Sequence, residues 1–122
     1  MNLNEIIERF TLVSGWKMSE VSRYLPLIED CKELFAERAA DDLSDAKRRR
    51  LSHACAAYAY YRVCLLLRDG GMENFKAGDV QISTAKIDDI CNSAFRMWES
   101  ERAVIADIIS FDDGFAFRSV SV

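Results

Sequence analysis

The chain has 122 residues, of which 50% are hydrophobic and 30% charged, with one proline and a formal net charge of −4. This composition predicts one domain with a buried core and excludes a long disordered tail. The negative charge argues against a dedicated nucleic-acid binder, which needs a basic face for its phosphate contacts.

Hydrophobic residues recur at helical spacing along most of the chain, so we predict a mainly α fold, a four-helix bundle-like domain with a long central helix. The first helix is expected between Asn2, which can cap it, and Gly15, which can end it. Pro26 is tolerated only in a first helical turn and so marks the start of the longer part of the second helix. The four predicted helices cover residues 3–13, 19–40, 43–69 and 84–110.

The third helix, expected to be capped by Asp41 or Asp42, should lie at the centre of the bundle. Residues 54–67 are apolar on nearly every side of it, which is typical of a helix that other helices surround. Its alanines would allow those neighbours to approach closely. This stretch contains Arg62 and is shorter than the ~20 residues that span a bilayer, so we predict no membrane contact.

Two β-prone segments, residues 74–82 and 115–121, form a small hairpin or two-stranded appendage in this predicted fold. Two strands alone make a marginal sheet with two unpaired edges. The segments can pair with each other over the last helix and bury their aromatic residues, or they can recruit another chain. Both alternatives stay open, and the second makes the segments candidate partner-binding sites. Their candidate contact residues are Phe75, Gly78, Asp79, Val80, Ile82, Phe115, Phe117 and Val120.

Residue chemistry indicates no catalytic residues, no metal site and no cofactor, so we predict that the protein is not an enzyme. An enzymatic alternative would require His53, the single histidine, to lie near a carboxylate in a pocket. The four cysteines lack metal-ligand spacing and are expected to be free thiols in the core. They are Cys31, Cys55, Cys64 and Cys91.

One basic run, Lys47, Arg48, Arg49 and Arg50, stands out in this acidic chain. Several aspartates precede it, so a solvated first turn of the third helix is the simpler interpretation, and contact with nucleic acid or a partner is the alternative. The N-terminal residues lack the basic flank and apolar run of a signal peptide, so we expect a cytoplasmic protein.

The order of the elements and three stretches of sequence resemble the small head-tail connector (adaptor) proteins of tailed phages and prophages. The stretches are residues 23–30, 57–62 and 75–82. In the last of them, an aromatic residue is followed by Ala-Gly-Asp-Val and a short β run.

The resemblance implies a structural protein of virion assembly, located in the bacterial cytoplasm or in the virion of an active prophage. Its partners would be copies of itself in a ring or other homo-oligomer, and phage portal or tail-completion proteins. The negative charge would suit a passage through which DNA slides without specific binding. The alternative is a cytosolic helical interaction or regulatory module that binds a partner helix in a groove.

Overall fold

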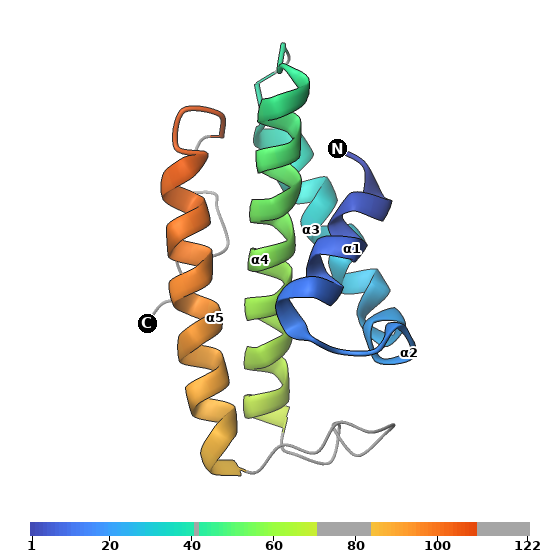
Figure 1. Cartoon of the computed structure of the whole chain (residues 1–122), viewed down its shortest axis with the longest axis vertical. Coiled ribbons are helices and arrows are strands. Elements are labelled where there is room, and N and C mark those ends of the chain that lie inside the picture. The colour runs from blue at the N-terminus through green and yellow to red at the C-terminus, as the bar shows by residue number, and fades with distance from the viewer. Residues whose placement is uncertain (41, 71–83, 110–122) are drawn as a thin grey trace.

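The computed structural model describes residues 1–40, 42–70 and 84–109, which form a bundle of helices. The helices are α1 Leu3–Ser14, α2 Met18–Val21, the 3₁₀ helix η1 Ser22–Tyr24, α3 Leu25–Arg38, α4 Asp45–Gly70 and α5 Thr84–Val104. In Figure 1, α4 stands between α5 on one side and α1 and α3 on the other. The predicted fold class, a mainly helical bundle with a long central helix, is confirmed. The predicted strands lie outside the described residues.

α1 is bounded by the two residues that the sequence indicates. The Asn2 side chain accepts a hydrogen bond of 2.8 Å from the Asn4 backbone N–H, which satisfies one unpaired donor of the first turn. At the other end, Gly15 has a φ of 70° and its N–H donates to the Thr11 carbonyl at 2.9 Å. Glycine adopts this left-handed conformation without steric strain. The turn brings Trp16 back against the bundle, where it is buried.

The helix predicted at residues 19–40 is divided into α2, η1 and α3. Pro26 lies in the first turn of α3 and has no N–H to donate to a carbonyl four residues earlier. Regular helical geometry is therefore interrupted at Tyr24, whose backbone has φ −106° and ψ 14°. α3 also ends two residues before the predicted limit, because Ala39 is extended and forms an antiparallel bridge with Ile109.

α4 begins at Asp45, two residues later than predicted. Ser44 caps it, rather than Asp41 or Asp42, and its hydroxyl accepts a hydrogen bond of 3.2 Å from the Lys47 N–H. Serine and aspartate are comparable capping residues, so composition alone did not distinguish these positions. The helix ends at Gly70, and its 26 residues give a length of about 39 Å.

α5 ends at Val104 rather than at the predicted residue 110. Residues 105–108 form turns, after which Ile109 reaches its bridge with Ala39. The Ala40 N–H donates to the Ile108 carbonyl at 3.1 Å. This contact joins the chain that follows α3 to the chain that follows α5.

α4 supplies the core of the bundle, as its sequence predicts. Every residue from 54 to 61 is buried, and the alanines among them let α1, α3 and α5 pack closely against it. Three groups of aromatic rings fill the space that remains. They are Phe10, Trp16, Tyr24 and Tyr60; Phe35, Tyr58 and Trp98; and the pair Tyr61 and Phe95.

The four cysteines are free and buried, in agreement with their predicted place in the core. Burial raises the pKa of the Cys31 thiol to about 12, and burial likewise raises the pKa of the Cys64 thiol to about 12. Only a thiolate is a strong nucleophile or metal ligand. At neutral pH these two thiols therefore stay protonated and act as small apolar side chains.

Candidate functional site

The predicted partner-binding residues all fall in segments outside the described residues. They are Phe75, Gly78, Asp79, Val80, Ile82, Phe115, Phe117 and Val120. Their pairing and their contacts remain predictions. The described helices nevertheless present surfaces of their own, which differ sharply on the two sides of α5.

The side of α5 that faces α3 is closed. Trp98 of α5 packs against Tyr58 of α4 and Phe35 of α3, with ring centres 4.9 Å and 5.9 Å away. All three rings are fully buried. The bridge between Ala39 and Ile109 covers the end of this side. Its apolar surface is therefore already occupied by the chain itself.

The side of α5 that faces α1 is hollowed instead. An apolar hollow of about 360 Å³ lies where Val13 of α1, Tyr60 of α4 and Met97 of α5 meet. The rest of its lining comes from α5 and consists of Lys86, Asp89, Ile90, Ser93 and Ala94. Val13, Ile90 and Met97 are only half-buried, so this apolar surface is accessible to another molecule.

A second hollow, of about 220 Å³, lies nearer the start of α4. It is lined by Glu5, Glu8, Arg9 and Leu12 of α1 and by His53 of α4. His53 precedes Tyr60 by two helical turns, which places both on one face of α4 about 10 Å apart. The first hollow is lined by α1, α4 and α5 and the second by α1 and α4, and we call the pair of them the α1–α5 groove. Its Tyr60 end is apolar, whereas its His53 end is charged.

Charged groups from three helices act on the His53 imidazole. Burial is the main cause that lowers its pKa below the ordinary value of 6.5. The neighbouring charges act in both directions: Arg9 lowers the pKa, Glu101 and Glu5 raise it, and Arg49 lowers it. The net effect is a lowered pKa, so His53 is neutral at pH 7.

The arrangement around His53 meets the condition set above for the enzymatic alternative, because Glu5 and Glu8 place carboxylates in the same hollow. The remaining lining, Arg9 and Leu12, contains no hydroxyl or thiol nucleophile that the imidazole could activate. The hollow therefore places a titrating group in a charged surface.

We expect His53 to make stability depend on pH. Because its pKa is lowered in the folded chain, the unfolded chain binds more protons once the pH falls below about 6.5. The free energy of unfolding therefore decreases as the pH falls from about 7 to about 5, and His53→Gln, which does not titrate, loses that part of the decrease. Urea unfolding of both proteins over this range measures the difference. Identical pH profiles would contradict the placement of His53 among these groups.

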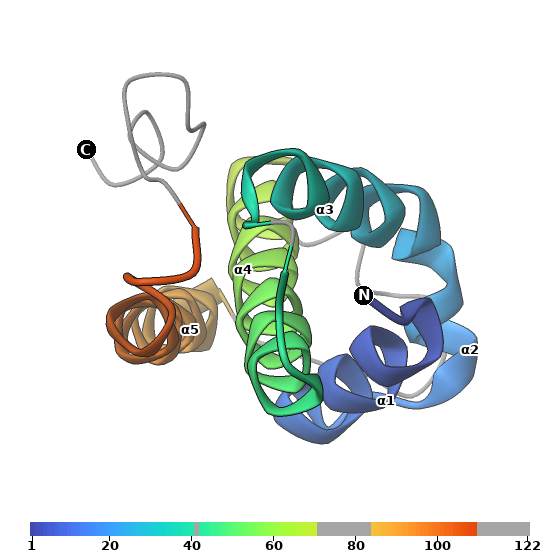
Figure 2. The same ribbon diagram turned by 90° about the horizontal axis from the view of Figure 1, so that it is seen from above.

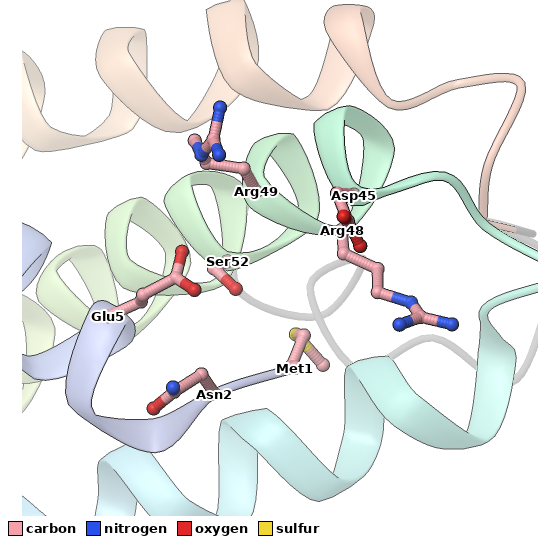
Figure 3. A pocket seen from close by; sticks show the side chains of 7 residues that line it. All are labelled: Met1, Asn2, Glu5, Asp45, Arg48, Arg49 and Ser52. Carbon is pink, nitrogen blue, oxygen red and sulfur yellow. The ribbon is translucent and has the colours of Figure 1, made fainter.

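A third hollow, of about 330 Å³, lies between the start of α1 and the start of α4 (Figure 3). Its lining consists of Met1, Asn2, Glu5, Asp45, Arg48, Arg49 and Ser52. In Figure 3 the Glu5 carboxylate lies near the Ser52 hydroxyl, whereas the guanidiniums of Arg48 and Arg49 extend in different directions. The two cations do not converge on one point, so we assign no anion or cofactor site to this hollow.

The cations that follow the start of α4 are Lys47, Arg48, Arg49 and Arg50, which we call the basic turn. All four are exposed. Successive residues of a helix point about 100° apart, so four in a row face every side of it. This exposure is consistent with a solvated stretch and leaves the cations accessible to a partner.

Sequence reasoning did not identify the α1–α5 groove. Its apolar residues occur on ordinary amphipathic helices, where a half-buried methionine or isoleucine looks the same as a core residue. Leu12 gave no usable signal either, although the structure places this apolar residue of α1 at the edge of the groove with 70% of its surface exposed. That exposure follows from where α1 and α5 lie on α4, which the periodicity of either helix does not encode.

In the described parts of the chain, no three side chains of His, Cys, Asp or Glu are placed to hold a metal ion. None of the helices described there combines the length and the apolar character needed to cross a bilayer. Comparison of the chain with models of protein families, with curated proteins and with solved structures gave no match.

Proposed function

We propose that the chain is a structural protein of virion assembly that binds other subunits without catalysing a reaction, in the manner of a phage head-tail connector. The resemblance of residues 23–30, 57–62 and 75–82 to connector proteins motivates the specific assignment. The α1–α5 groove is the observation that carries the binding role, since α5 leaves this side open while its other side is closed. The buried rings and alanines around α4 pack beneath this surface and hold its helices in place.

The groove fits an amphipathic helix of a portal or tail-completion protein. At one end, Ile90 and Met97 present apolar surface to side chains spaced three or four residues apart. At the other end, the carboxylates of Glu5 and Glu8 outnumber the Arg9 guanidinium. A lysine or arginine two turns further along the partner helix would complement that end.

The same groove supports a second candidate function, a cytosolic helical module that binds a partner helix and has no role in a virion. The two functions differ in their association behaviour. A connector joins copies of itself and a portal, whereas such a module stays monomeric and binds a helix from an unrelated protein.

Charges placed in the apolar end of the groove test the binding role. We expect Ile90→Glu and Met97→Glu each to weaken binding to the portal protein of the same genome by at least about tenfold, because a carboxylate would be desolvated without a partner. Titration calorimetry measures the affinity. Circular dichroism checks that each variant keeps its helical content, which we expect because both positions are only half-buried.

Ala103→Glu is the matched control, since it places the same charge at an exposed position of α5 that does not line the groove. We expect this variant to bind as the unmodified chain does. Equal affinity for all three variants would mean that the groove does not receive the partner. Loss of binding in Ala103→Glu alone would place the partner on the outer face of α5.

A further inference from the structure

The outer face of α3 is strongly acidic. Four carboxylates on this helix are exposed, while its two cations, Lys32 and Arg38, are half-buried. The carboxylates are those of Glu29, Asp30, Glu33 and Glu37, which we call the acidic face. Glu29, Glu33 and Glu37 are spaced four residues apart, so they follow one stripe along the helix. The surface of α3 therefore presents a row of negative charge to solvent.

The basic turn of α4 carries the opposite charge, and because its four cations face every side of the helix, one contact uses only the cations on one side of it. Its four cations are exposed, and Asp45 is the only acid among the first six residues of α4. Within the described residues, no ion pair joins the acidic face or the basic turn to another side chain. Among the described residues of one copy, therefore, no ion pair neutralises either surface.

The two surfaces lie apart on the bundle. Figure 2 shows α3 along one side, while the start of α4 lies across the end of the bundle, toward α1. A contact between an acidic face and a basic turn can therefore form between two copies that are turned relative to each other.

We propose that copies of this chain associate head-to-tail, with the acidic face of α3 in one copy against the basic turn of α4 in the next. This inference rests on the proposed function and specifies which surfaces the copies use. Such a contact joins two different surfaces, so a linear row of copies has a free acidic face at one end and a free basic turn at the other. The row closes into a ring when the rotation between neighbouring copies permits. The charges set the orientation and the rate of the encounter.

Local charge, rather than the charge of the whole chain, favours a second copy over nucleic acid as the partner of the basic turn. A net charge of −4 opposes the approach of a second copy as well as that of a phosphate backbone. The acidic face of another copy supplies a compact set of carboxylates without the long row of charges that a nucleic acid brings. Binding of duplex DNA to the basic turn is the outcome that would favour the other partner.

Charge reversal on each surface tests the contact. One variant carries Glu33→Lys and Glu37→Lys, and the other carries Arg48→Glu and Arg49→Glu. Acids near the start of a helix and bases near its end complement the helix dipole, so we expect both variants to fold. At about 20 mM salt, each variant alone should associate at least tenfold more weakly than the unmodified chain, as measured by sedimentation velocity.

An equimolar mixture of the two variants is the decisive arm. In the mixture, the α4 turn made acidic by Arg48→Glu and Arg49→Glu can contact the α3 face made basic by Glu33→Lys and Glu37→Lys. The native acidic face of one variant and the native basic turn of the other also carry opposite charges. Association should therefore return in the mixture, and about 500 mM salt should weaken it. A third variant with Glu99→Lys and Asp107→Lys has the same net charge as the first, with both changes at exposed positions elsewhere. It should associate as the unmodified chain does.

Three results would overturn the contact: a monomeric unmodified chain at low salt, association unchanged by either reversal, or a mixture that stays dissociated. Loss of duplex DNA binding in Arg48→Glu with Arg49→Glu, with self-association intact, would assign the basic turn to nucleic acid. Portal binding by the unmodified chain is measured separately. If it persists while self-association fails, this contact is wrong and the proposed function stands.

Discussion

Replacement of Trp98 by alanine is expected to lower the free energy of unfolding by about 3 to 5 kcal/mol. Trp98 is fully buried on α5 and lies 4.9 Å from the Tyr58 ring and 5.9 Å from the Phe35 ring. Its removal leaves a cavity where α3, α4 and α5 meet, and it also takes away the aromatic contacts. Urea unfolding followed by circular dichroism measures the change.

Val104→Ala is the control for Trp98→Ala, because Val104 is an apolar residue of the same helix that is 48% exposed. We expect a change below about 0.5 kcal/mol for it. A loss below about 1 kcal/mol for Trp98→Ala would mean that α5 does not pack on α4 through this ring. In that case, the side of α5 that faces α3 would not be closed by this ring.

Phe10→Ala is expected to cost about 3 to 5 kcal/mol as well. Phe10 is fully buried, and its ring centre lies 6.0 Å from that of Trp16 and 5.7 Å from that of Tyr60. These rings hold α1 on α4 at the point where Gly15 turns the chain. Thermal unfolding of the variant should show a lower midpoint with the transition still cooperative.

Leu12 provides the comparison for Phe10, since it is an apolar residue two positions further along α1 and is 70% exposed. Leu12→Ala should change the free energy of unfolding by less than about 0.5 kcal/mol. If both alanine variants cost the same, the face of α1 that contacts α4 would differ from the one described above.

The sequence predicts the parts of this fold that depend on local patterns. The apolar run at residues 54–67 indicates a helix surrounded by others, and α4 is that helix. Asn2 and Gly15 bound α1 because capping and left-handed backbone conformations are properties of single residues. The four cysteines fall in the core because their helical spacing places them on inward faces.

The features that the sequence did not predict depend on contacts between distant segments, or on neighbouring residues with nearly equal capping propensity. The bridge between Ala39 and Ile109 pairs residues that lie 70 positions apart, and one pair of residues leaves no periodic signal. Its formation shortens α3 relative to its predicted end. Ser44 caps α4 in competition with aspartates of similar capping strength.

The candidate sites also divide into one that a local sequence pattern indicates and one that depends on how the helices pack. The basic turn was evident in the sequence as a run of charge, although the surface that we propose it contacts was not. The α1–α5 groove was invisible, because it exists only where α1 and α5 lie on neighbouring faces of α4 and leave Tyr60 and His53 between them. A periodicity argument assigns each helix an inward face and cannot say which of its neighbours will cover it.

The most direct measurement is the molar mass of the purified chain by size-exclusion chromatography with light scattering, alone and with the portal protein of the same genome. Binding by an assembly subunit predicts a mass well above the 13.9 kDa of one copy at low salt, and a stable complex with the portal protein. A mass of one copy under both conditions would contradict a structural role in virion assembly.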